Sequence, residues 1–313
     1  MTLRLSWLVM IGMTACSPYA FQQEVTSFST SVDQLSDAVT SGYTNLASDR
    51  AAKNEFELTS TRAKVFVAAS CGVPITKDNQ PCELFRSGLP EPTAMRAQEL
   101  AGRALEVVSV LKNYARALAA VTNSADRTAF DAAVMQLSGS VANLAQTANA
   151  AAPGAGAIAP AAVKLAGWVV GTALDQARFD SLKRGVNFAA EPVRTIAGTL
   201  RKGLEDISSA RQTVLVAEAD LMAKRLGPSL DDSSYQQQLT QAEATVSVLD
   251  ALRYSDPAGT ADSLKTAHDA LVAAVNDPNR SYASLLKAVS DFSEKAAALK
   301  AAFSASSPAS AGL

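Results

Sequence analysis

Histidine, cysteine and tryptophan are scarce in this 313-residue sequence, which holds one, three and two of them respectively. A single histidine excludes the histidine-rich ligand sets of most zinc enzymes and leaves one candidate for histidine-dependent catalysis. The sequence also lacks a Gly-x-Ser-x-Gly elbow, a His-Glu-x-x-His pair and a phosphate-binding loop. We therefore expect no enzyme, no metal centre and no cofactor.

Aromatic residues and glycine are also rare, and neither positive nor negative side chains are in marked excess. Aromatic residues make up 6% of the chain, with 16 glycines and 12 prolines, while 48% of the residues are hydrophobic and alanine is the most frequent. This composition favours helices over a sandwich or a barrel. The 28 basic and 30 acidic side chains nearly cancel, and basic residues cluster only as dipeptides such as Lys183-Arg184. No nucleic-acid partner is expected.

The first 15 residues have the layout of a secretory signal peptide. Arg4 precedes an apolar run that extends to Met13, and small residues lead to Cys16. As a helix, such a run of about 11 apolar residues is about 16 Å long, too short for a hydrocarbon core of about 30 Å.

The sequence Met13-Thr14-Ala15-Cys16 resembles the lipobox of bacterial lipoproteins, with methionine in place of the usual leucine. The resemblance implies cleavage after Ala15, a diacylglycerol on the Cys16 sulfur and acylation of the new amine, with the lipid bilayer as a partner. Ser17 rather than aspartate follows the cysteine, which in the enteric version of the family implies sorting to the outer membrane. Residues 16–21 would form the anchor and tether.

Cys71 and Cys82 flank a turn-rich loop of proline, glycine and asparagine. In an oxidising envelope compartment, such an even pair predicts a disulfide. Closing so short a loop is worth roughly 3 kcal/mol in the chain-entropy model.

The rest of the chain predicts an all-α fold, an elongated bundle of about seven helices with coiled-coil-like heptad seams spanning residues 22–303. Apolar residues recur at steps of three and four, and no segment has the period of two expected of strands. The seams lie in residues 22–68, 93–121, 130–144, 161–188, 193–221, 235–249, 264–275 and 282–303.

Several boundaries follow from turn and breaker residues. We expect turns at 122–128 and 276–281, a connector at 151–160, a helix break at Pro192 and a disordered tail at 304–313. In the helix after residue 233, the expected buried seam consists of Tyr235, Leu239, Ala242, Val246 and Leu249.

Two sets of residues carry both a chemical and a structural interpretation. His268 could act as a general base beside Asp269, but it shares its helical phase with Leu271, so we expect a partly buried, hydrogen-bonded core histidine. Asp231 and Asp232 could pair for acid–base chemistry or calcium, but they directly precede a helical seam. At this position their negative charges would stabilise the positive end of the helix dipole, so we expect them to be helix-start residues.

Residues 151–174 contain a single charge, Lys164, and a close-packing pattern from Gly167 through Trp168 to Gly171. This segment would be either a membrane-inserting element, loosely similar to those of helical pore-forming toxins, or a core helix whose small residues let neighbours approach closely. Proline limits the uninterrupted helix to residues 161–174, about 21 Å, which is too short to cross the bilayer. The core interpretation is therefore favoured.

These observations predict a non-enzymatic lipoprotein that is anchored to the outer membrane through Cys16, faces the periplasm and acts as a helical scaffold for a protein partner. The alternative is a membrane-active, pore-forming-like protein that exposes residues 151–174.

Overall fold

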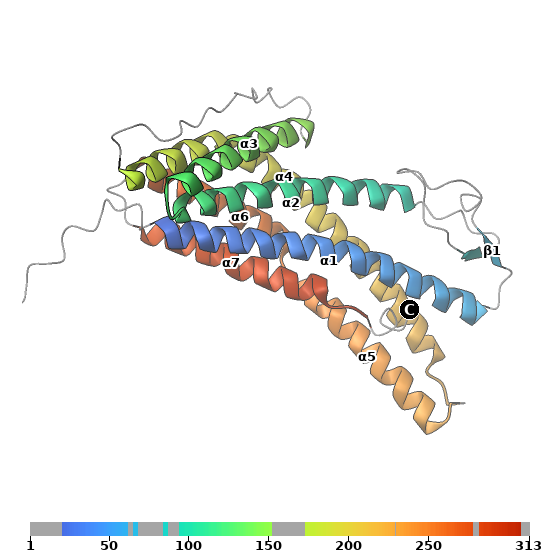
Figure 1. The fold of residues 1–313 in the computed structure, drawn as a ribbon. Coiled ribbons are helices and arrows are strands. Elements are labelled where there is room, and N and C mark those ends of the chain that lie inside the picture. Colours follow the sequence, from blue (N-terminus) through green and yellow to red (C-terminus); the bar gives the residue numbers. More distant parts are fainter. Residues whose placement is uncertain are drawn as a thin grey trace, which may run out of the picture. The chain divides into compact units, whose positions relative to one another are not determined.

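The computed structural model describes residues 21–61, 65–67, 84–86, 94–151, 173–228, 230–277 and 282–307. Within these ranges the chain forms seven helices and two short strands (Figure 1). The helices are α1 (Gln22–Thr61), α2 (Ala94–Asn123), α3 (Arg127–Ala151), α4 (Leu174–Arg225), α5 (Asp232–Tyr254), α6 (Pro257–Asn276) and α7 (Ala283–Ser304). The expected helical bundle of about seven helices is confirmed.

The chain divides into two compact units, and several helices contribute a part to each. Unit 1 comprises Met1–Asp33, Val107–Thr199 and Ala261–Glu294. Its core contains apolar side chains at helical spacing from α1, α2, α3, α4, α6 and α7. Fully buried examples are Phe28, Leu111, Leu118, Phe130, Leu137, Leu182, Val193, Leu271 and Phe292.

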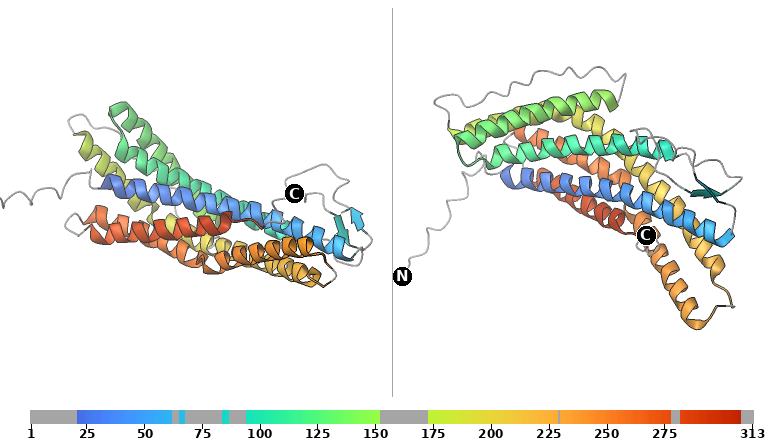
Figure 2. Two further views of the ribbon diagram at one scale, coloured as in Figure 1. Left: turned by 90° about the horizontal axis from the view of Figure 1, so that it is seen from below. Right: turned by 45° about the vertical axis from the view of Figure 1, so that its right-hand side comes forward.

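Unit 2 comprises Gln34–Glu106, Leu200–Thr260 and Lys295–Leu313. Here α5 runs back along the C-terminal part of α4 (Figure 2), and the Thr245 hydroxyl lies 3.9 Å from the Met222 sulfur. The core of this unit includes Leu35, Val39, Leu46, Leu204, Ile207, Leu215, Leu252 and Phe303.

Two short strands correct the expectation that the body is helical throughout. Instead of continuing to residue 68, α1 ends at Thr61, and β1 (Val65–Val67) pairs antiparallel with β2 (Leu84–Arg86). Val65 lies opposite Arg86 and Val67 opposite Leu84. Three hydroxyl residues end α1, and such side chains compete for backbone hydrogen bonds. The β-branched and aromatic residues that follow favour a strand.

The predicted break at Pro192 is wrong, because α4 runs through it as one helix of 52 residues. Ala189 and Val193, on either side of the proline, are fully buried, as is Ile196. Burial of the same helix face before and after Pro192 offsets the lost backbone hydrogen bond, so tertiary packing overrides the local preference.

The predicted tail begins too early. Ser304 ends α7, and Ser307 is fully buried. Residues 308–313 lie outside the described part of the chain. The turn between α2 and α3 is confirmed, and Asp126 caps α3 by accepting a hydrogen bond from the Ala129 amide at 2.9 Å.

The buried face of α5 also differs from the predicted seam. Thr245, Val248 and Leu252 are buried, whereas Tyr235 and Val246 of the expected seam are 40% and 45% exposed. Heptad spacing therefore identified an apolar stripe, but a neighbouring face of the helix packs against the rest of unit 2.

Candidate functional site

The only histidine of the chain lies in the core of unit 1, as the sequence predicted, and is fully buried. His268 on α6 places its Nε2 atom 2.8 Å from the hydroxyl oxygen of Tyr114 on α2. The Phe28 ring lies 6.1 Å from the imidazole, between centroids, and also contacts Phe292. A polar pair is thus enclosed by aromatic side chains.

The electrostatics of this pair keep both groups neutral. Burial lowers the pKa of His268 to about 3, with a smaller contribution from the Arg194 guanidinium. Burial also raises the pKa of Tyr114 well above its ordinary value. The imidazole Nδ1 has no hydrogen-bond partner among the described residues. A neutral, enclosed imidazole cannot exchange protons readily with a substrate, so the geometry makes His268 a packing residue that joins α2 and α6.

A second buried polar cluster, in unit 2, was not identified from the sequence. The Arg211 side chain on α4 is fully buried, and its Nε lies 2.8 Å from Oδ2 of the equally buried Asp49 on α1. Its Nη1 and Nη2 donate to the carbonyl oxygens of Phe303 and Ala305, at 3.1 and 2.8 Å. The Asn45 amide donates to the same Phe303 oxygen at 2.8 Å. The guanidinium therefore lies at the negative end of α7, where it binds one carbonyl of the last turn and one just beyond the helix.

Glu218 completes this cluster one heptad after Arg211. Its side chain is fully buried, and neither carboxylate oxygen has a hydrogen-bond partner of good geometry among the described residues. Burial raises the pKa of Glu218 to about 7, and the negative charge of Asp49 adds to this, while the hydroxyls of Ser307 and Thr245 oppose it. Burial also raises the pKa of Asp49, although Arg211 opposes the shift.

A signal for this cluster is present in the sequence. The α4 seam runs through Ile207, Val214 and Leu221 at steps of seven, and Arg211 and Glu218 occupy the intervening core positions. Asp49 likewise follows Leu46 by three residues on α1. Charged residues at seam positions indicate buried polar groups, because the helical phase places them inside.

Asp231 confirms the helix-start interpretation. It is the N-cap of α5, and its carboxylate accepts hydrogen bonds from the Ser234 amide at 2.9 Å and from the Ser234 hydroxyl at 2.7 Å. Hydrogen bonds from Ser233 and Ser234 lower the pKa of Asp231 well below its ordinary range. Among the described residues, no three His, Cys, Asp or Glu side chains are grouped to hold a metal ion.

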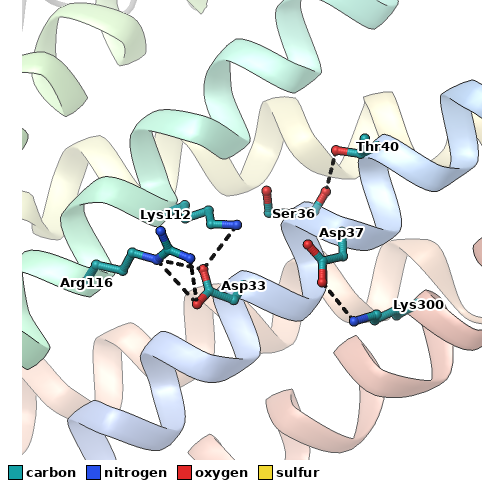
Figure 3. Close-up of polar contacts among 7 residues, drawn as sticks. All are labelled: Asp33, Ser36, Asp37, Thr40, Lys112, Arg116 and Lys300. Carbon is teal, nitrogen blue, oxygen red and sulfur yellow. Dashed lines mark hydrogen bonds and ion pairs between the residues drawn. The ribbon is translucent and has the colours of Figure 1, made fainter.

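Exposed ion pairs connect helices within each unit (Figure 3). In unit 1, Asp33 on α1 binds Arg116 Nε at 3.1 Å and Lys112 Nζ at 3.4 Å, both on α2. In unit 2, Asp37 on α1 lies 2.8 Å from the Lys300 ammonium on α7. These pairs are partly solvated, so each adds little to stability.

The remaining predicted site residues, Cys16, Cys71, Cys82, Lys164, Gly167, Trp168 and Gly171, lie outside the described residues. The ladder of β1 and β2 does bring Val67 opposite Leu84, at the two ends of the segment that contains Cys71 and Cys82.

No helix within the described ranges is both long enough and apolar enough to cross a membrane. In comparisons with family models, curated proteins and solved structures, nothing matches this chain.

Proposed function

We propose that this protein is a non-enzymatic lipoprotein, held to the periplasmic face of the outer membrane by acylated Cys16, whose helical body binds a protein partner. The signal layout and the lipobox-like residues up to Cys16 support the anchor. Two or more acyl chains on one cysteine would hold the protein stably, whereas one chain would bind only marginally.

The observation that carries the non-enzymatic part of the proposal is the position of His268. The one residue that the sequence offered as a general base is enclosed by Tyr114 and Phe28 in the core of unit 1. Its pKa of about 3 leaves it neutral at any envelope pH. Asp49 and Glu218, two carboxyl groups whose pKa burial raises, are fully buried in unit 2.

Long helices suit a binding role. At 1.5 Å per residue, the 40 residues of α1 and the 52 of α4 correspond to about 60 and 80 Å of helix. Such helices offer extended surfaces to another protein without requiring a cavity. The alternative, a membrane-active protein, depends on residues 151–174, of which 152–172 lie outside the described residues.

Metabolic labelling with palmitate, followed by cross-linking in intact cells, tests the proposal. The full-length protein should incorporate the label, fractionate with the outer membrane and cross-link to a defined protein. The Cys16→Ser variant should lose the label and the membrane fraction. Equal labelling of the variant, or recovery of lipid without any protein partner, would contradict the proposal.

A further inference from the structure

One side of α5 carries an apolar stripe that the described part of the chain covers only in part. We call Tyr235, Leu239, Ala242, Val246 and Leu249 the α5 stripe. Tyr235 and Val246 are 40% and 45% exposed, and the other three are partly exposed. The spacing of four, three, four and three residues is that of a coiled-coil seam.

The stripe is distinct from the face by which α5 packs in unit 2. That face is marked by the buried Thr245, Val248 and Leu252. At about 100° per residue, the centre of the α5 stripe lies about 110° around the helix from the centre of the buried face. The fold therefore buries one face of α5 and leaves the α5 stripe, which lies beside it, partly exposed.

Exposed apolar residues elsewhere do not form such a pattern. Outside α5, the exposed large apolar residues among those described are Met135 on α3 (71%), Phe188 and Val216 on α4 (49% and 53%) and Leu286 on α7 (48%). Each is a single residue, as is normal on protein surfaces. Five positions in heptad register on one helix form a continuous surface of the kind that binds a partner helix.

Acidic side chains accompany the α5 stripe along one flank. Asp232, Glu243 and Asp250 are exposed, and helical geometry places them about 60° to 80° from the stripe centre, on the side away from the buried face. An oxygen of the Asp250 carboxylate lies 3.8 Å from a guanidinium nitrogen of Arg253. Tyr254, which is 87% exposed, lies at the C-terminal end of the same flank. Flanking charges of one sign select a partner with the opposite sign.

We propose that the α5 stripe docks an amphipathic helix of another protein, with an apolar heptad seam and lysine or arginine along the flank that meets Asp232, Glu243 and Asp250. This inference rests on the proposed binding function and specifies its surface and the chemistry of the partner.

A second copy of this chain fits the surface poorly. In an antiparallel pair of α5 helices, the two-fold axis places equal flanks opposite each other, so three carboxylates would face three carboxylates. Like charges across a helix pair are destabilising. In a parallel pair, the acidic flank of one copy would face the other flank of the second copy's stripe. That other flank lies next to the buried Thr245, so it is already covered within unit 2 of the second copy.

Two synthetic peptides test the charge preference. Each has about three heptads with leucine at the a and d positions, and the flanks carry either lysine or glutamate. Fluorescence anisotropy of each labelled peptide with the whole protein lacking the lipid anchor measures affinity. The lysine peptide should bind at least about tenfold more tightly than the glutamate peptide, and its binding should weaken with salt.

Three variants locate the binding. Val246→Glu should reduce affinity for the lysine peptide at least about tenfold, because it places a charge in the apolar seam. Met135→Glu, an equally drastic change at an exposed apolar position of unit 1, should leave affinity unchanged. Glu243→Lys combined with Asp250→Lys should reverse the preference, so that the glutamate peptide binds more tightly. Circular dichroism checks that each variant keeps its helical content.

Equal affinity for both peptides, or equal loss in the Val246→Glu and Met135→Glu variants, would overturn the inference. A dimer in sedimentation that Val246→Glu dissociates would overturn it in favour of self-association. An envelope partner whose cross-linking is unaffected by Val246→Glu would preserve the proposed function and refute only the role of the α5 stripe. A Cys16 without lipid would instead refute the anchor and leave the peptide results intact.

Discussion

At the centre of unit 2, the Arg211 guanidinium neutralises the buried Asp49 carboxylate and binds two carbonyl oxygens at the end of α7. Arg211→Met would leave the carboxylate and both carbonyls buried without their donor. We expect a loss of about 3 to 5 kcal/mol in the free energy of unfolding, measured by urea denaturation. Lys300→Met, which removes the partly exposed pair with Asp37, should lose less than about 1 kcal/mol.

A double variant separates the ion pair from side-chain packing. Asp49→Leu combined with Arg211→Met replaces both charges by apolar groups, so stability should recover in part relative to Arg211→Met alone. No recovery would show that the carbonyl contacts, rather than the unpaired carboxylate, account for the loss.

The buried carboxyl of Glu218 makes stability depend on pH. Its pKa rises from 4.5 to about 7 on folding, so between these values the folded state binds more protons than the unfolded chain. Stability from this group is therefore greatest below pH 4.5 and falls as pH rises through 7, by at most about 3 kcal/mol. Glu218→Gln should be more stable than the parent protein at pH 8, and the difference should shrink towards pH 5.

Urea denaturation of Glu218→Gln and of the parent protein at pH 8 and pH 5 isolates this effect. His268 makes stability change with pH in the opposite direction, but both proteins contain it, so its contribution cancels in the difference. Glu205→Gln, the same substitution at a half-exposed position of α4, serves as the matched control. A constant difference between Glu218→Gln and the parent protein would refute the elevated pKa.

Titration of His268, the single histidine of the chain, measures directly whether its imidazole is buried. His268 has a pKa of about 3 when folded, below its ordinary value of 6.5. Its side-chain resonances in an NMR titration should therefore not shift between pH 8 and pH 5. A midpoint near 6.5 would mean that the imidazole is hydrated and not held against Tyr114.

At the scale of helices, the same substitution should have opposite effects at two glycines. A Cβ atom at Gly42 of α1 would lie 2.5 Å from Cδ2 of the buried Phe303, whereas one at Gly198 of α4 meets nothing within 4 Å. Gly198→Ala should stabilise the protein by about 0.5 to 1 kcal/mol through reduced chain entropy. Gly42→Ala should destabilise it by about 1 to 3 kcal/mol through overpacking. Thermal denaturation compares the two, and a gain at both positions would contradict the close contact.

Helical periodicity predicted the helices well because their apolar faces pack at that period. The seam from Leu285 to Phe303, for example, is buried throughout α7 at the expected positions, including Phe292 and Leu299. Local signals failed where tertiary burial decides the outcome. Pro192 lies inside α4 because both neighbouring turns are buried, and only three residues form each strand, too few to show a period of two.

The polar clusters were predictable to different degrees. His268 shares its phase with apolar neighbours, so its burial follows from spacing alone, but the identity of its partner, Tyr114, requires the tertiary structure. Arg211 and Glu218 occupy seam positions, yet pairing with Asp49, 162 residues away, depends on packing between helices that are distant in sequence.

At the scale of the whole molecule, the scaffold and membrane-active hypotheses differ in how the protein meets lipid. The chain has two tryptophans, and Trp7 lies in the proposed signal peptide, so Trp168 would be the reporter for residues 151–174 in the mature protein. Protein lacking Cys16 should show the same Trp168 emission with and without anionic vesicles, and the vesicles should retain an enclosed dye. A blue shift accompanied by dye leakage would support the membrane-active alternative, and loss of leakage in Gly167→Leu would assign it to this segment.

The division into units also constrains the order in which the chain can fold. Unit 1 combines residues up to and including Asp33 with residues as late as Glu294, and unit 2 combines α1 from Gln34 onward with the chain from Lys295. Neither unit is complete until the last helix has been synthesised. Until then Asp49 and Arg211 lack the α7 carbonyls and can remain hydrated, while the apolar seams lack their final partner. Contacts between segments so distant in sequence slow folding relative to local contacts, and neither core can close before the last residues of the chain are available.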